Sequence, residues 1–376
     1  MHKLACLVPV AGFESNKTYL PARFTLQFKS VTNNNNILED DMFKIRLLVT
    51  ALALTSSLSV MAADSLPKTA PAPADNPTTP EKVELGKMLY HDPRLSSTGT
   101  VSCASCHNTM LGGEDNRPNS MGVNGQTGGR SAPTVWNAAF NKVQFWDGRA
   151  DSLEAQAAGP VTNPIEMGMK SWDDVVARLK TIKGYRQAFD LAFGSDHETI
   201  TKDNATKAIA AYERTLITPN SAYDKYVEGD KAAMNEQQVR GMQKAVELGC
   251  TSCHSGPAFN GPGMFQKFPV HNNGYFEAQY HFKKDKGLAE VTKKETDEHL
   301  FKVPTLRNIA LTAPYMHNGS VKTLDKAVKI MAKVQLDKEL SDEDTADIVA
   351  FLNALTGEFP KQTMPVLPGT PGSSFN

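Results

Sequence analysis

The sequence contains the pentad Cys103-Ala-Ser-Cys106-His107, and a second pentad, Cys250-Thr-Ser-Cys253-His254, begins 147 residues later. In each pentad, two thiols three residues apart lie on one face of a helical turn, and the next residue places an imidazole beside them. Two such cysteines can bind the vinyl groups of a haem as thioethers while the histidine ligates the iron. The pentads therefore predict two covalently bound c-type haems.

Two other kinds of site use the same residue types. A structural zinc ion needs four ligands, whereas each pentad offers three, and pooling the pentads would join ligands far apart in the chain. A redox dithiol has no use for a histidine in both copies. Four of the five cysteines fall in the pentads, and an odd total is unusual for a disulfide scaffold. These arguments favour haem over a zinc site or a pair of redox disulfides.

The composition is that of a globular protein. Of 376 residues, 22% are charged and 40% are hydrophobic, which excludes collagen, wholesale disorder and a polytopic membrane protein. The formal net charge is -1, and no run of Lys or Arg supplies a basic patch. DNA and RNA are therefore excluded as partners.

The N-terminal region has the pattern of an exported protein. Lys44 and Arg46 precede an apolar stretch that ends near Val60 in small residues, so we expect a signal peptide over residues 42–63. Residues 1–41 would make an unusual leader, so we expect them to be an upstream non-native start, with translation beginning at Met42. A retained membrane anchor is the alternative. Covalent haem attachment requires export, so the expected location is the periplasm.

The spacing of the pentads predicts two domains of about 150 residues, each with one haem. Similar short sequences, Leu85-Gly86-Lys87 and Arg240-Gly241-Met242, lead into the two pentads. Five prolines between Asp64 and Pro80 predict an extended linker that joins no core. The expected parts are a linker over 64–80, an N-terminal haem domain over 81–225, a C-terminal haem domain over 226–360, and a tail over 361–376.

Helical periodicity dominates the rest of the chain, and no segment shows sustained strand alternation. Long loops rich in Gly and Pro, Leu111–Pro133 and Ser255–Val303, are expected to wrap the cofactors. The expected fold class is mainly α, with two cytochrome c-like haem domains and long irregular loops. Four helices are expected. One is capped by Ser171, and a second runs from Ala205 to Ile217 with Asp203 as its cap. A third runs from Asn235 to Leu248, and the last begins at Ser341 and stops at Gly357.

Several further motifs resemble the bacterial dihaem cytochrome c peroxidase family in their order and spacing, over roughly Glu81 to Pro360. The resemblance implies an enzyme that reduces hydrogen peroxide to water with electrons from a small periplasmic cytochrome c or cupredoxin, and that generally works as a homodimer. The motifs are Ala132-Pro-Thr-Val-Trp-Asn-Ala-Ala-Phe140, Phe145-Trp-Asp-Gly-Arg-Ala150, Gln156-Ala-Ala-Gly-Pro-Val161, Asn163-Pro-Ile-Glu-Met167 and Thr312-Ala-Pro-Tyr-Met-His-Asn-Gly319.

The resemblance also implies roles for single residues. The first pentad would hold the peroxidatic haem, with Glu166 as its distal acid and base and Gln156 as the distal neighbour. The second pentad would hold the electron-entry haem, with Met331 as its sixth ligand. Trp146 would carry electrons between the haems. His317 could either pack beside haem or take part in electron transfer.

One departure from the family concerns the peroxidatic iron. Many members place a His 16 residues after the proximal His, where it blocks the iron until the other haem is reduced, whereas position 123 is Val here. Because Val cannot ligate iron, we expect an open iron in the fully oxidised protein, ready without reductive activation. Met121 or Met110 in the same loop is the alternative occupant.

A second departure concerns calcium. The family binds Ca²⁺ between its domains through two backbone carbonyls, which match Thr312 and Pro314, and through an Asn side chain that is replaced by Ser131 here. Ser is a weaker oxygen ligand, so Ca²⁺ is expected to bind loosely or to be absent. Calcium remains among the expected cofactors.

Two rival functions stay open. The first is a related dihaem enzyme that forms a ferryl species and oxidises a protein or an organic molecule. Relatives of that kind resemble this chain at the pentads but use Tyr where Met331 is assigned. The second is a dihaem electron carrier without catalysis, which Glu166 and the vacated position 123 disfavour.

Overall fold

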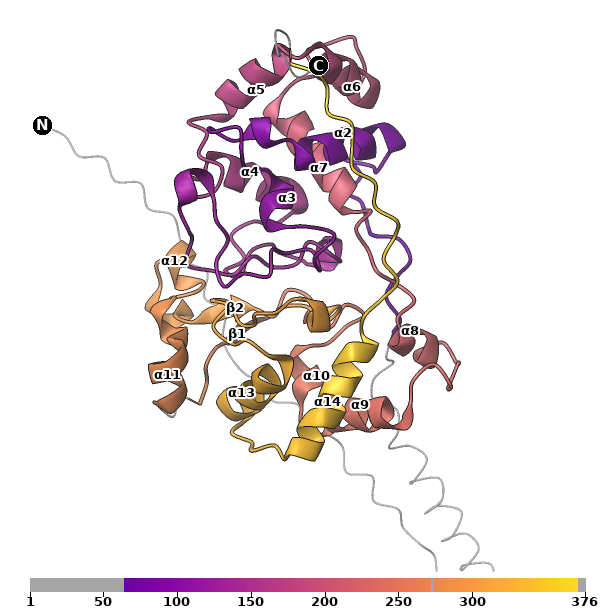
Figure 1. Cartoon of the computed structure of the whole chain (residues 1–376), viewed down its shortest axis with the longest axis vertical. Coiled ribbons are helices and arrows are strands. Elements are labelled where there is room, and N and C mark those ends of the chain that lie inside the picture. Colours follow the sequence, from indigo (N-terminus) through magenta and orange to yellow (C-terminus); the bar gives the residue numbers. More distant parts are fainter. Residues whose placement is uncertain (1–63, 272–273, 371–376) are drawn as a thin grey trace, which may run out of the picture. The chain divides into compact units, whose positions relative to one another are not determined.

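The computed structural model describes residues 64–271 and 274–370, and the chain is mainly helical there (Figure 1). This confirms the expected fold class. The expected signal peptide and upstream start lie outside the described residues. No helix within the described part of the chain is long and apolar enough to cross a membrane.

The N-terminal half, residues 64–220, is built around a crossing of α2 and α7. Gly86 in α2 makes this crossing possible, because a Cβ atom there would lie 1.8 Å from the Ala208 carbonyl oxygen of α7. Leu85 and Leu89 of α2 are buried in the core of this half. Its helices are α2 Pro80–His91, α3 Cys103–Cys106, α4 Leu153–Thr162, α5 Trp172–Lys180, α6 Lys183–Phe193 and α7 Lys202–Glu213, with 3-10 turns at Pro93–Leu95, Val123–Gly125 and Ala138–Phe140.

The C-terminal half, residues 221–370, repeats the same crossing with α9 and α14. A Cβ atom at Gly241 of α9 would lie 1.8 Å from the Asp347 carbonyl oxygen of α14. The similar sequences noted before the two pentads therefore occupy equivalent helix crossings. The helices are α8 Ala222–Val227, α9 Glu236–Glu247, α10 Cys250–Cys253, α11 Tyr275–Tyr280, α12 Ala289–Thr292, α13 Leu324–Leu336 and α14 Asp342–Ala354, with 3-10 turns at Phe282–Lys284, Glu295–Asp297 and Ile309–Leu311.

Most of the expected helix starts are confirmed. Ser171 caps α5, Asn235 caps α9 and Ser341 caps α14, each through a side chain that accepts a backbone N–H in the first turn. The expectation for Asp203 is wrong, because Thr201 caps α7 by accepting the Asn204 N–H. Asp203 lies in the first turn instead, where its charge still suits the helix dipole.

The region 255–303 is more ordered than the expected long loop. It contains the strands β1 Phe265–Lys267 and β2 Leu300–Lys302, which pair antiparallel with Phe265 opposite Lys302. Each strand has three residues, which is too short for an alternating pattern to stand out in the sequence. The loop Leu111–Pro133 agrees better with the expectation, with one 3-10 turn at Val123–Gly125.

The expectation that residues 64–80 join no core is wrong. Leu66 is 2% exposed, and its backbone N–H donates to Asp224 of α8. Asn76 is fully buried and donates through Nδ2 to the Glu154 carboxylate and the Lys207 carbonyl. The prolines stiffen the segment, but its few buried side chains find partners in both halves of the molecule.

The division between the two halves lies slightly earlier than residue 225. That boundary falls inside α8, whose Tyr223 belongs to the hydrophobic core of the C-terminal half. The segment after α14 runs back along the N-terminal half (Figure 1), where Phe359 packs edge-on against Trp136 and the Pro368 carbonyl accepts a hydrogen bond from Arg94.

Candidate haem sites

Both pentad histidines are held in the same way. His107 Nδ1 lies 2.9 Å from the Pro133 carbonyl oxygen, and His254 Nδ1 lies 3.0 Å from the Pro304 carbonyl oxygen. A histidine that donates its Nδ1–H to a carbonyl keeps Nε2 as the basic nitrogen and has a fixed ring orientation. Each histidine could therefore ligate a metal through Nε2.

The four pentad cysteines have the surroundings of structural thiols. All four are free of disulfides, and burial raises the pKa of each thiol, that of Cys103 to about 12. Reactive or metal-binding thiols have a lowered pKa instead. No group of three or more His, Cys, Asp or Glu side chains within residues 64–271 and 274–370 is placed to share one metal ion. The pentads fit thioether attachment of haem better than zinc or dithiol chemistry.

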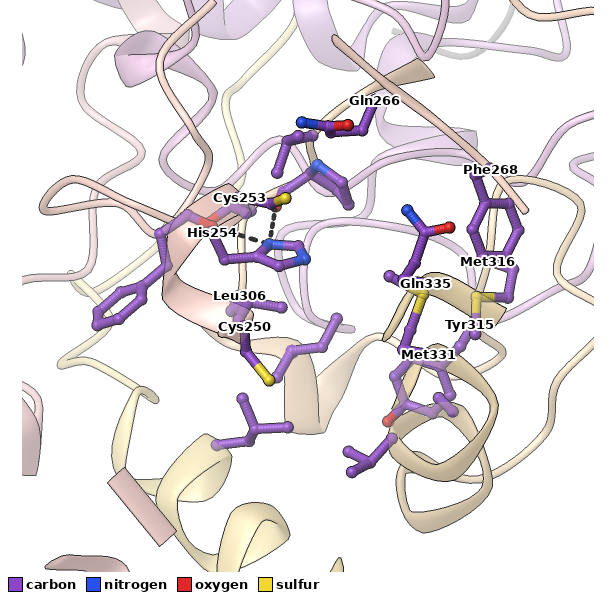
Figure 2. A pocket seen from close by; sticks show the side chains of 18 of the residues that line it. Cys250, Cys253, His254, Gln266, Phe268, Leu306, Tyr315, Met316, Met331 and Gln335 are labelled. Carbon is purple, nitrogen blue, oxygen red and sulfur yellow. Dashed lines mark hydrogen bonds between the residues drawn. The ribbon is translucent and has the colours of Figure 1, made fainter. Parts of the chain in front are cut away.

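A cavity lies beside the second pentad, and Figure 2 shows His254 on one side of it and Met331 on the other. Met331 comes from α13, and the walls are mainly apolar, with Leu306 and Phe268 among the lining residues. An imidazole nitrogen facing a thioether sulfur across an apolar cavity is the axial pair of a six-coordinate haem used for electron transfer. The residues present fit that cofactor.

Several residues that were not expected from the sequence also line this cavity. Met316 offers a second thioether (Figure 2), and Lys302, a buried residue, also lines the cavity. Tyr315 also lines the cavity, and burial raises the pKa of its phenol. Since Met316 and Tyr315 directly precede His317 in a recognised motif, their position in that motif was a usable signal.

Glu166 lies close to the first pentad. Its Oε1 accepts a hydrogen bond of 2.8 Å from Asn163 Nδ2, in the turn that follows α4. Burial raises the pKa of Glu166, and Arg149 opposes part of this shift. The Glu166 charge also raises the pKa of Cys103 and Cys106, which places the carboxylate within electrostatic reach of both thiols. The first pentad therefore has a carboxyl group within its electrostatic reach.

Val123 lies directly beside the Glu166 turn. Its backbone N–H donates to the Glu166 carbonyl at 2.9 Å, and a Cβ atom at Gly122 would lie 1.9 Å from the Ile165 carbonyl oxygen. The Val123 side chain is 2% exposed and belongs to the N-terminal core, whereas Met110 and Met121 are 71% and 50% exposed. The loop thus carries an apolar side chain inward and both methionines outward.

Gln156 is less clearly connected to this site. It lies on α4, and no hydrogen bond between its side chain and Glu166 is found in the described structure. The nearest backbone connection is a hydrogen bond between neighbouring residues. The Pro160 carbonyl, one turn after Gln156 on α4, accepts the N–H of Met167, which follows Glu166.

Trp146 and His317 both line the cavity beside the second pentad. Trp146 Nε1 donates to the Ser131 carbonyl at 2.9 Å, and its ring meets the His317 ring edge-on at 6.5 Å. The His317 ring stacks on Phe301 at 4.4 Å, and burial lowers the pKa of His317 to about 4. His317 is therefore a neutral ring in an aromatic cluster.

The three residues expected at a calcium site lie around the same cavity. Ser131, Thr312 and Pro314 all line it, together with Trp146. The Ser131 hydroxyl lies 3.4 Å from the Arg117 carbonyl, so its oxygen is only weakly engaged.

The two halves meet through a pair of equivalent hydrogen bonds. The Ser131 N–H donates to the His317 carbonyl and the Lys302 N–H donates to the Trp146 carbonyl, both at 2.8 Å. Each donor lies two residues before the proline that holds its pentad histidine. The motif Pro-Thr-x-x-Asn, at 133–137 and 304–308, marks this internal repeat, and both asparagines are left-handed, with φ of 64° and 60°. This repeat was readable in the sequence.

Comparison with known proteins agrees with this geometry. Residues 80–232 match the family model described as di-haem cytochrome c peroxidase. The chain is 44% identical over 333 residues to the cytochrome c551 peroxidase of Nitrosomonas europaea, covering 87% of this chain and 96% of the relative. It is 46% identical over 294 residues to the cytochrome c peroxidase Ccp of Escherichia coli, covering 77% of this chain and 61% of that longer relative.

A solved structure shows the same architecture. A MauG-like protein associated with microbial copper homeostasis superposes with a TM-score of 0.68 at 31% identity, covering 78% of this chain and 95% of that one. Family membership implies two c-type haems and a haem-dependent peroxidase acting on peroxide. The chain belongs to the di-haem cytochrome c peroxidase family.

Proposed function

We propose that the haem attached at Cys103, Cys106 and His107 is the peroxidatic haem and that Glu166 is its acid and base. A haem bound there would supply the iron that binds hydrogen peroxide and the electrons that cleave its O–O bond. The observation that carries this proposal is the half-buried Glu166 carboxyl, which has a raised pKa and lies within electrostatic reach of Cys103 and Cys106.

Glu166 has one oxygen free for proton transfer. Asn163 donates to Oε1, so this oxygen stays an acceptor and Oε2 is the oxygen that gains or loses a proton. Oε2 would take a proton from peroxide and return it to the leaving oxygen, so that a water molecule departs. The raised pKa makes the carboxylate a stronger base toward peroxide, and a pKa closer to the working pH suits a group that both takes and returns a proton.

The C-terminal half would receive electrons. His254 and Met331 would ligate the second iron, and a Met ligand raises the reduction potential, as a haem that accepts electrons from a donor requires. The donor would be a small cytochrome c or a cupredoxin in the periplasm. Electrons would pass between the halves where Lys302 N–H meets the Trp146 carbonyl and where Trp146 meets His317.

The peroxidatic iron would be open without reductive activation. Val123 fills the position of the blocking histidine with an apolar side chain that is buried in the core, and Met110 and Met121 are exposed. We also propose a homodimer, and a weakly held Ca²⁺ near Ser131, Thr312 and Pro314.

The test is hydrogen-peroxide-dependent oxidation of a reduced small cytochrome c by the purified holo-protein. Turnover is started from the fully oxidised enzyme and, in parallel, after one-electron reduction. Equal and prompt turnover in both supports an open peroxidatic iron. Turnover only after reduction keeps the peroxidase and removes the proposal of an open site. Absence of turnover in both states contradicts the proposed peroxidase with a cytochrome donor and favours the protein-oxidising relative or the electron carrier.

A second candidate is oxidation of a protein or an organic molecule, and the MauG-like structural neighbour is the observation that favours it. Met331 argues against it, because the relatives that do such chemistry use Tyr at that place. The rate of peroxide consumption separates the two functions. Faster consumption with a reduced cytochrome than with a protein or organic substrate alone supports the peroxidase, and the reverse supports the second candidate.

A further inference from the structure

Lys302 places a positive charge in the cavity beside the second pentad. Lys302 lines this cavity together with His254 and Met331, its charge adds to burial in lowering the pKa of His254, and the residue is 8% exposed. The backbone on either side is fixed, because the Lys302 N–H donates to the Trp146 carbonyl and the Pro304 carbonyl holds His254 Nδ1. Lys302 also pairs with Phe265 in the two-stranded sheet. Its position is therefore set by the fold.

The ammonium group of Lys302 has no anionic partner in the described protein. No ion pair or side-chain hydrogen bond within residues 64–271 and 274–370 involves its Nζ, and burial lowers its pKa to about 8. Buried charges are otherwise paired in folded proteins, because removing a charge from water is costly. Arg307 shows the usual arrangement, since it is fully buried and forms an ion pair of 2.7 Å with Asp224.

The walls of the cavity offer no counter-charge. None of its lining residues is Asp or Glu, and Lys302 is the one Lys or Arg among them. The two glutamines labelled in Figure 2 are already engaged: Gln335 bonds the backbone of Lys267 and Val270, and Gln266 lies 3.5 Å from the Met264 sulfur. An anion that enters this cavity would meet Lys302 as its free cationic partner.

A haem carries two propionate groups, which are anions of the required kind. We propose that Lys302 forms an ion pair with a propionate of the haem attached at Cys250 and Cys253, and that it raises the reduction potential of that haem. The inference rests on the proposed placement of the electron-entry haem. The physical cause is that reduction adds an electron to the haem, and a nearby cation in an apolar cavity stabilises the added negative charge. The cation also offsets the charge of the propionate, which otherwise opposes reduction.

The experiment measures the reduction potentials of both haems in the holo-protein by optical spectroelectrochemistry. The variants are K302M, which removes the charge, K302R, which keeps it, and K302Q as a polar neutral replacement in case K302M does not mature. K267M is the matched control, because Lys267 lies on the paired strand with an exposed side chain. Protein mass first establishes that two haems are covalently attached in each variant, and the charge-transfer band of Met-ligated iron identifies the electron-entry haem.

We expect K302M and K302Q to lower the potential of the Met-ligated haem, K302R to stay close to the wild type, and K267M to have no effect. An unchanged potential in K302M or K302Q, with both haems attached, overturns the inference and leaves the proposed function intact. A changed reduction potential of only the haem attached at Cys103 and Cys106 overturns the assignment of the ion pair to a propionate of the second haem. A wild-type protein without a Met-ligated haem contradicts the proposed function itself, and with it the inference.

Discussion

The two pentads have the same local structure and different surroundings. In both, a four-residue helix carries the cysteines and a proline carbonyl holds Nδ1 of the histidine. Near the first pentad lies the Glu166 carboxyl, and across from the second lies the Met331 thioether. We infer that the attachment motif sets what is bound, whereas residues contributed by other segments set what the bound group can do.

The largest expected effect comes from removing the acid and base of the first site. E166Q keeps the size of the side chain but cannot exchange a proton, so we expect kcat/KM for hydrogen peroxide to fall by about 10²–10⁴-fold. The exposed E236Q on α9 is the control and should retain full activity. Steady-state oxidation of a reduced cytochrome c measures both. Wild-type activity in E166Q would show that another group moves the proton.

The second-largest effect is expected from a substitution that gives the first site a sixth iron ligand, as Met331 is proposed to give the second. V123H restores a potential iron ligand beside Glu166, so we expect prompt turnover of the oxidised enzyme to be lost and to return after one-electron reduction. V123A is the control for the loss of the packed side chain, which is buried in the core. Spin-state spectroscopy of the oxidised protein should show a second low-spin haem in V123H alone. A high-spin haem in V123H would mean that position 123 cannot reach the iron.

The third expected effect is a pH dependence that belongs to the first site. Burial raises the pKa of Glu166, and its ionised form accepts the proton from peroxide. As the pH falls through this raised pKa, kcat/KM should fall about tenfold per pH unit, starting above the ordinary Glu value of about 4.3. Rapid-mixing kinetics of peroxide binding across the acidic range measure this acidic limb of the pH profile. The same limb in E166Q would assign it to a different group.

The smallest expected change in turnover comes from the second site. M331L removes the thioether, so we expect the electron-entry haem to lose its low-spin spectrum and its potential to fall, with a modest decrease in donor-driven turnover. M316L is the matched control in the same cavity and should leave the spectrum unchanged. Loss of the low-spin signal in M316L instead would exchange the two assignments.

Much of the fold could be predicted because it depends on short sequence separations. Ser171, Asn235 and Ser341 start their helices as expected, since a cap acts on residues two or three positions away. Thr201 was missed because Asp203, two residues on, offers the same kind of side-chain oxygen. The strands β1 and β2 were missed because each depends on a partner some 35 residues away rather than on its own pattern.

The candidate sites divide in the same way. Each pentad determines which group is attached to it, because thiols three residues apart and an adjacent imidazole form a haem attachment site within a single turn. Long-range packing decided what lies around them: the burial of Val123 under the Glu166 turn, the position of Met331 opposite His254, and a cavity around Lys302 whose lining residues, in the described part of the chain, include no carboxylate.

The sequence by itself therefore determined the cofactor class, the mainly α architecture and the family of this protein. Only the tertiary structure decided which residues share a cavity, which charges lack a partner, and how Leu66 and Asn76 join the folded body. The physical reason is that covalent attachment and helix capping act between neighbours along the chain. Burial and charge pairing depend on every segment that packs around a residue, including segments far away in the sequence.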